Sequence, residues 1–161
     1  MKTYPITIEL NGEARNTDVS ATETLLDVLR NKFDAVEVKN GCEQGDCGAC
    51  TVTLDGKAVN ACLVLALQAS GKAVTTVKGI GSQTSPHALQ RAFVEQGAIQ
   101  CGYCTAGMIT AAKALLDEKS TATTAEIRQA ISGNLCRCTG YKKIVAAIES
   151  VAKKEPATHK R

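Results

Sequence analysis

The eight cysteines of this 161-residue chain fall into two groups of four, and they restrict its possible folds more than any other feature. The first group is Cys42, Cys47, Cys50 and Cys62, and the second is Cys101, Cys104, Cys136 and Cys138. Four disulfides are one interpretation. Eight cysteines in 161 residues fall below the roughly 8–10% typical of disulfide scaffolds. A chain of this length with 44% apolar residues can also fold around a core without such crosslinks. The grouping favours two centres of four thiolates each.

The first group has the spacing of a plant-type [2Fe–2S] centre, because four, two and eleven residues separate its successive cysteines. Three glycines lie among these cysteines: Gly41, Gly45 and Gly48. Glycine leaves room for backbone N–H groups to approach the cluster sulfurs and stabilise the reduced form. Zinc is the rival metal. Zinc sites typically use C-x2-C pairs or histidines, and neither His87 nor His159 is near this group in the sequence.

The second group combines a C-x2-C pair with a C-x-C pair, and 31 residues lie between the pairs. This pattern is unusual for zinc or disulfides, because C-x-C places two thiolates almost side by side. If the first pair begins one helix and the second pair precedes another, two helix N-termini point at the site. Their partial positive charge suits an anionic cluster. Arg137, between the last two cysteines, either compensates the charge of the cluster or faces solvent.

Hydrophobic periodicity predicts an α+β unit over residues 1–80. Apolar and polar residues alternate over 6–10, which predicts a half-buried strand. A hairpin over 51–59 is expected to turn at Asp55-Gly56. Leucines at helical spacing predict a short helix after Thr22, and a last strand is expected over 74–77.

Residues 81–155 are predicted to form an all-α unit, after a linker around 78–82. Helices are expected over 88–96 and 105–118. The Thr123–Glu126 capping box opens a third helix. A fourth helix contains Ile144 and Ala152, and four short helices indicate a small bundle. Residues 156–161 are expected to be a flexible polar tail.

Composition excludes several classes of function. Five aromatic residues and a net charge of +3 argue against a nucleic-acid binder. The charge is uneven, at −2 over residues 1–80 and +5 over residues 81–161. No stretch approaches the ~20 apolar residues of a membrane span. The N-terminus shows no export signal, which predicts a cytoplasmic protein. No Gly-x-Gly-x-x-Gly or P-loop motif is present to hold a flavin or nucleotide.

The sequence around both groups resembles the xanthine oxidase family of molybdenum hydroxylases. Residues 40–52, NGCEQGDCGACTV, resemble its ferredoxin-like domain. Residues 100–105, QCGYCT, and residues 133–141, GNLCRCTGY, resemble the two halves of its second [2Fe–2S] motif. The resemblance covers roughly residues 5–153. Many members carry proline at the position of Ala106, and proline in the first turn of a helix is dispensable.

This resemblance implies an N-terminal β-grasp, plant-type ferredoxin-like domain followed by an all-α four-helix bundle domain. It also implies an electron-transfer subunit with two [2Fe–2S] clusters. A large subunit would hold Mo-molybdopterin and hydroxylate the substrate, and a medium subunit would carry FAD. The assembly would be a heterotrimer or a dimer of heterotrimers. Gln100, beside a cysteine, is implied to contact the pterin. The alternative is that it caps backbone groups near the helix start.

From the residues themselves, the chain is predicted to relay electrons and to contain no catalytic residues of its own. A free-standing, diffusible ferredoxin is the main alternative. A plant-type ferredoxin would need only about the first 80 residues and a strongly acidic surface, whereas the first half here is only −2. A structural or sensing zinc protein is the other alternative. The sequence does not predict the substrate of the complex.

Overall fold

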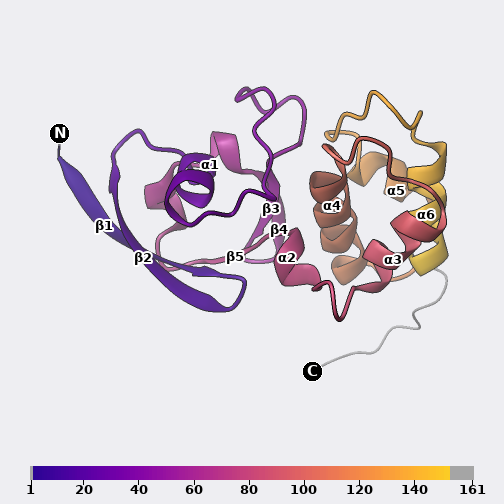
Figure 1. Ribbon diagram of the computed structural model, residues 1–161, viewed down its shortest axis with the longest axis horizontal. Helices are drawn as coiled ribbons and strands as arrows, with labels where there is room; N and C mark the ends of the chain where they lie inside the picture. Colours follow the sequence, from indigo (N-terminus) through magenta and orange to yellow (C-terminus); the bar gives the residue numbers. More distant parts are fainter. Residues whose placement is uncertain (1, 153–161) are drawn as a thin grey trace.

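Residues 2–152 are described by the computed structural model, which places a sheet-containing lobe beside a helical lobe (Figure 1). The sheet has five strands in the order β2-β1-β5-β3-β4. Their bounds are β1 (Thr3–Leu10), β2 (Glu13–Ser20), β3 (Thr51–Leu54), β4 (Lys57–Asn60) and β5 (Ala73–Thr75). The central pair, β1 and β5, is parallel, and the other pairs are antiparallel.

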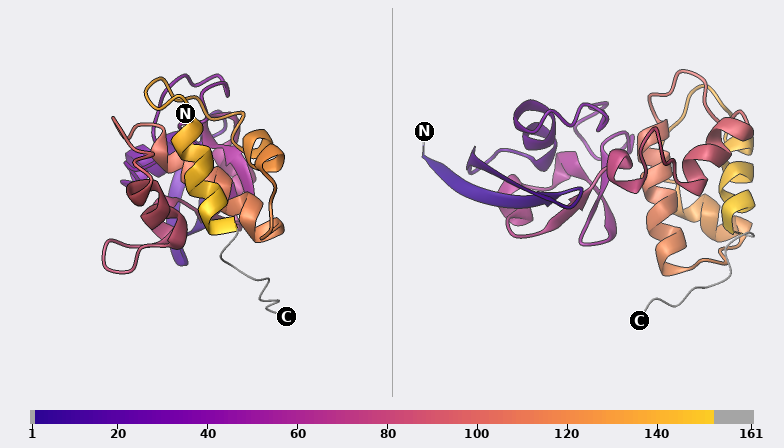
Figure 2. Two further views of the ribbon diagram at one scale, coloured as in Figure 1. Left: turned by 90° about the vertical axis from the view of Figure 1, so that its right-hand side faces the viewer. Right: turned by 60° about the horizontal axis from the view of Figure 1, so that its bottom comes forward.

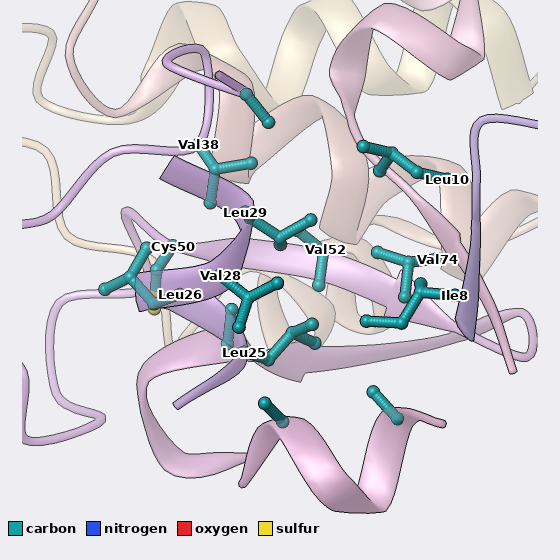
Figure 3. Packing of buried hydrophobic residues seen from close by; sticks show 14 of the residues in the cluster. Ile8, Leu10, Leu25, Leu26, Val28, Leu29, Val38, Cys50, Val52 and Val74 are labelled. Carbon is teal, nitrogen blue, oxygen red and sulfur yellow. The ribbon is translucent and has the colours of Figure 1, made fainter. Parts of the chain in front are cut away.

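One face of this sheet forms the first hydrophobic core. Along β1 the buried residues Ile6, Ile8 and Leu10 alternate with exposed ones, which confirms the half-buried strand. The core is closed by α1 (Leu25–Asp27), whose Leu25 and Leu26 are buried in it, and Leu26 lies beside Cys50 (Figure 3). The hairpin of β3 and β4 forms as predicted, with Asp55 and Gly56 both at positive φ.

The short helix predicted after Thr22 is present, but only its first turn is α-helical. Its N-cap is Thr24, which forms a capping box with Asp27, and after α1 the chain continues as a single π-helical turn over Val28–Lys32. Leucines at helical spacing marked the buried face correctly. They do not reveal that the turn over Val28–Lys32 is π-helical.

Two differences concern strands. The sequence prediction missed β2, whose residues are mostly exposed, so that apolar and polar residues do not alternate along it. The strand predicted over 74–77 was placed too far toward the C-terminus. It ends at Thr75, because Thr76 caps a short helix, α2 (Val77–Ile80), and accepts a hydrogen bond from the Lys78 N–H.

The other helices are α3 (Ala88–Glu95), α4 (Thr105–Glu118), α5 (Thr124–Ala130) and α6 (Lys142–Ala152). They lie within a residue or two of the predicted ranges, and the Thr123–Glu126 capping box is present. A second core lies among them, with α6 on the outer side (Figure 2). Val77 and Ile80 of α2 pack against this core, so the segment predicted as a linker begins with a helix.

The two lobes meet where α4 packs against β3 (Figure 1). The helix presents Gly107 and Ala111 there, both buried, and their small size lets helix and sheet approach closely. None of the helices within residues 2–152 has the length and apolar character that crossing a bilayer requires. The predicted tail over 156–161 lies outside the described residues.

Candidate functional site

Three cysteines of the first group lie in the long loop before β3, and the fourth arrives from the other end of the β3–β4 hairpin. Cys42 and Cys47 are half-buried in the loop, and Cys50 is buried where the loop joins β3. Cys62 is buried in a 3-10 turn (Ala61–Leu63) directly after β4. The hairpin therefore brings Cys62 back to Cys50, and a backbone hydrogen bond from Ala61 to Cys50 O at 3.3 Å joins these segments.

The loop gives its thiols different environments. The N–H groups of Gln44 and Cys47 each donate to Cys42 Sγ at 3.4 Å. These hydrogen bonds lower the pKa of Cys42 to about 7, because they stabilise the thiolate. Burial raises the pKa of Cys50 to about 11. The loop therefore directs two backbone donors at the Cys42 sulfur.

The second group is positioned by two helix starts. Cys104 is the N-cap of α4, and Cys101 lies three residues before it. Cys136 and Cys138 lie in the loop that leads into α6. The expectation that both pairs precede helices is confirmed, and α4 forms with Ala106 in its first turn where many relatives have proline. Burial raises the pKa of Cys104 to about 12. Burial also raises that of Cys136, but the Thr139 hydroxyl, 3.1 Å from its sulfur, brings it below the ordinary value.

Within each group the thiols interact in pairs, and the pairs also interact with one another. Cys42 hydrogen-bonds with Cys47, and Cys50 with Cys62. In the second group Cys138 Sγ lies 3.6 Å from Cys101 Sγ, and Cys104 hydrogen-bonds with Cys136. Two pairs of thiols fit a two-iron centre, because each iron takes two cysteine ligands.

The glycines of the first loop have different roles. A Cβ on Gly41 would lie 2.7 Å from Cys47 Sγ, so this glycine leaves room beside a sulfur. Gly45 has φ +83°, and a Cβ there would meet the tip of the Leu63 side chain. Gly48, at φ +66°, serves the contact between lobes, because its Cβ would lie 2.3 Å from Gly133 O. The sequence interpretation gave no such role to Gly48.

The remaining candidates are exposed. Gln100 lies at the surface beside Cys101, which is also exposed. Arg137 is exposed as well, and its guanidinium makes no hydrogen bond or ion pair in the part of the chain that the structure describes. This agrees with the alternative in which Arg137 faces solvent.

Three residues that the sequence analysis had not singled out support the cysteine loops. Tyr141 OH accepts a hydrogen bond from the Cys136 N–H at 2.8 Å and donates to Asn134 O at 3.4 Å. Tyr103 OH donates to Asn40 O at 2.5 Å, across the two lobes. Asn134 is buried between them. None of these side chains is a cysteine thiolate that could ligate an iron–sulfur cluster, so the spacing of the cysteines did not point to them.

This arrangement defines a class of protein: a ferredoxin-like α+β lobe with a plant-type cysteine loop, joined to a helical lobe with a second thiol quartet. Residues 8–76 match the family model of the 2Fe-2S iron-sulfur cluster binding domain. Residues 76–149 match that of the [2Fe-2S] binding domain. The chain therefore has two domains that each bind a [2Fe–2S] cluster.

Several relatives resemble the chain over nearly its whole length. The nicotinate dehydrogenase small FeS subunit of Eubacterium barkeri is 50% identical, and the match covers 92% of this chain and 94% of that protein. The nicotine 6-hydroxylase small subunit of Paenarthrobacter nicotinovorans is 48% identical, with 89% and 86% covered.

Solved structures also resemble this chain over nearly its whole length. A chain of quinoline 2-oxidoreductase from Pseudomonas putida 86 superposes with a TM-score of 0.90 at 41% identity, over 95% of this chain and 96% of that one. The aldehyde oxidoreductase of Desulfovibrio desulfuricans ATCC 27774 superposes with a TM-score of 0.88 at 46% identity, over 94% of this chain but 17% of that longer one. The chain belongs to the small iron–sulfur subunits of the xanthine oxidase family of molybdenum hydroxylases.

Proposed function

We propose that this chain relays electrons from a molybdopterin centre on a large subunit toward FAD on a medium subunit or another acceptor. The observation that carries the proposal is the presence of two thiol quartets, each arranged as two pairs, on two domains in direct contact. Each bound [2Fe–2S] cluster supplies one reversible one-electron step. The nicotinate dehydrogenase and nicotine 6-hydroxylase relatives are likewise named as small subunits of enzymes, the first of them as an FeS subunit.

All eight cysteines are the proposed ligands, one quartet for each cluster. The surrounding residues prepare these sites. Backbone N–H groups at Cys42 favour a thiolate before any iron is bound, and Gly41 keeps space beside Cys47. In the helical domain, the N-terminus of α4 lies at Cys104 and offers partial positive charge to an anionic centre.

The surface near the cysteines supports a subunit rather than a diffusing carrier. Large apolar side chains are exposed beside the proposed ligands: Leu63 at 62%, Leu135 at 55% and Tyr103 at 47%. Exposed apolar groups next to a redox site are typical of a surface that a partner covers. The free-standing ferredoxin is therefore the weaker interpretation.

The finer parts of the proposal concern the assembly. Gln100 is proposed to contact the pterin of the large subunit, since its amide is exposed beside Cys101 and offers both a donor and an acceptor. The helical domain, as a four-helix bundle, then faces the large subunit, and the ferredoxin-like domain faces the FAD-binding subunit. A dimer of such heterotrimers is the proposed oligomer. Eight free thiols fit a reducing, cytoplasmic setting.

Metal analysis and spectroscopy test the proposal. The purified complex is expected to contain four irons per small subunit, two for each centre. After dithionite reduction, electron paramagnetic resonance is expected to show two signals with different relaxation, because the two quartets lie in different surroundings. Zinc in place of iron, or only two irons per chain, would contradict the proposed function.

A further inference from the structure

The two cysteine loops are joined by a direct backbone hydrogen bond. The Leu135 N–H donates to Cys47 O at 2.9 Å. Cys47 is a proposed ligand of one cluster, and Leu135 immediately precedes Cys136, a proposed ligand of the other. A through-bond connection therefore runs from Cys47 Sγ along its own backbone, across one hydrogen bond, and through Leu135 to Cys136 Sγ. In Figure 1 the two loops lie on the same edge of the molecule, beside one another.

Asn134 holds this connection in place. Its side chain is only 4% exposed, and its Nδ2 donates to Gly48 O at 2.9 Å and to Thr51 Oγ1 at 3.0 Å. Both partners belong to the ferredoxin-like domain. The Thr51 hydroxyl donates in turn to Gly48 O at 2.7 Å. Both N–H groups of the amide are thus satisfied by the opposite domain, and both the amide and the Thr51 hydroxyl belong to buried residues.

Close packing prevents the contact from sliding. A Cβ on Gly48 would lie 2.6 Å from Asn134 Nδ2, and a Cβ on Gly107 of α4 would lie 2.3 Å from Gly48 O. Neither glycine can therefore be replaced without moving the Asn134 amide or the Gly48 carbonyl. On the other side of the loop, the two hydrogen bonds of Tyr141 fix the backbone of Asn134 and Cys136.

We propose that Asn134 is a positioning residue for electron transfer between the two centres of this chain. It keeps the Cys47–Leu135 hydrogen bond formed and fixes the spacing of the clusters. In the step concerned, one centre loses one electron and the other gains it, with no bond made or broken. The inference rests on the function proposed above. Electronic coupling falls steeply when a through-bond route is replaced by a gap, so a loosened contact slows this step.

The test compares Asn134→Ala with Asn60→Ala in the purified complex. Asn60 is the matched control, because its Nδ2 also donates to a carbonyl of the cysteine loop, that of Gly45 at 2.8 Å, but within one domain. Its Oδ1 lies 3.4 Å from the Thr51 hydroxyl, but that hydroxyl has a closer acceptor in Gly48 O at 2.7 Å, so Asn60→Ala leaves the partners of Asn134 in place. Three quantities are measured: the iron content, the magnetic interaction between the two reduced centres at low temperature, and the rate of electron equilibration between them after a rapid one-electron reduction. Hydrogen exchange at the Leu135 amide reports on the bridge itself, with or without iron.

The expected result for Asn134→Ala is full iron content, faster exchange at Leu135, a weaker magnetic interaction, and electron equilibration slowed roughly tenfold. Asn60→Ala is expected to leave the Leu135 exchange and the magnetic interaction unchanged. An iron-loaded Asn134→Ala complex with the magnetic interaction and equilibration rate of the unaltered protein overturns the proposal.

Thr51→Val keeps the test decisive if Asn134→Ala does not take up iron. It removes one acceptor of the Asn134 amide and the hydroxyl that supports Gly48, while the side-chain volume is kept. An intermediate slowing is expected, and unchanged equilibration with faster Leu135 exchange overturns the proposal. Failure of the proposed function is distinguishable, because the unaltered complex then lacks two iron centres.

Discussion

Gly48 shows how one residue serves both the cysteine loop and the domain interface. Its φ of +66° is a conformation that other residues adopt at a cost, and a Cβ there would be within 2.8 Å of three atoms of Gly133 and Asn134. The strain and the steric clash arise from different physical causes, so substitutions at different glycines can separate them.

We expect Gly48→Ala to lower the free energy of unfolding by about 3 kcal/mol, from the combination of backbone strain and overpacking. Gly71→Ala is the control, since Gly71 has φ +76° with no atom within 4 Å of its Cβ position. Its expected cost is about 1 kcal/mol, from strain alone. Urea unfolding of both variants measures the difference, and equal losses would show that the interface does not restrict Gly48.

Gln100 gives a second prediction at this scale. Gln100→Ala is expected to slow reduction of the helical-domain cluster by substrate roughly five- to tenfold, about the value of one hydrogen bond. The iron content should stay the same, because the side chain is exposed and is not a proposed ligand. Rapid-freeze spectroscopy of the complex provides the measurement. An unchanged rate would favour the alternative in which Gln100 only caps backbone groups.

The cysteines were predictable from the sequence, whereas the residues that hold them together were not. A thiolate is one of the few groups that bind an iron–sulfur cluster, so spacing alone identified the candidate ligands. Asn134 sits in a Gly-Asn dipeptide, which is common in ordinary turns. Its burial depends on a partner 86 residues away in the chain. No local pattern encodes that contact.

At the scale of elements, the helical domain was the easier half to predict. The apolar residues of α4 and α6 repeat at helical spacing, and caps mark where helices begin, so the predicted bounds agree closely with the structure. In the first domain, β2 lies at the sheet edge and is mostly exposed, so its pairing with β1 rather than its side chains makes it a strand. The end of β5 likewise depends on a tertiary contact, because Asn11 Oδ1 accepts the Thr76 N–H at 2.8 Å.

The capping box of α5 has a predictable pH dependence. Hydrogen bonds from Lys119 and Thr123 lower the pKa of Glu126 from 4.5 to about 2. A carboxyl group whose pKa is lower in the folded state stabilises the fold above its unfolded pKa, and this stabilisation is lost as pH falls toward 2. Glu126→Gln keeps an acceptor for the cap but removes the charge. It should modestly lower the melting temperature near neutral pH.

The difference between Glu126→Gln and the unaltered chain should shrink as pH falls from about 4.5 toward 2, since both side chains are then neutral. Glu118→Gln is the control, because Glu118 is exposed and forms no ion pair among the described residues. Thermal unfolding across this pH range provides the measurement. A difference that does not depend on pH would show that the charge of Glu126 plays no part.

At the scale of the whole molecule, two separate cores meet where α4 packs against β3. Because each quartet belongs to its own core, we expect the two centres to assemble independently. Cys47→Ser should remove the first paramagnetic signal and leave the second, with the iron content reduced by half, and Cys104→Ser should do the reverse. Loss of both signals from either substitution would show that the chain loads iron as one unit.

The close approach of Gly107 to Gly48 also limits which domains of related chains can be combined in one hybrid chain. A hybrid that joins residues 2–76 of this protein to the helical half of a relative keeps all eight cysteines, yet a side chain larger than hydrogen at position 107 would press on the Gly48 carbonyl. The two domains are therefore interchangeable only between chains that share this close contact between positions 48 and 107. Compatibility of the two domains at this contact, more than the presence of the cysteines, decides which hybrids can be built.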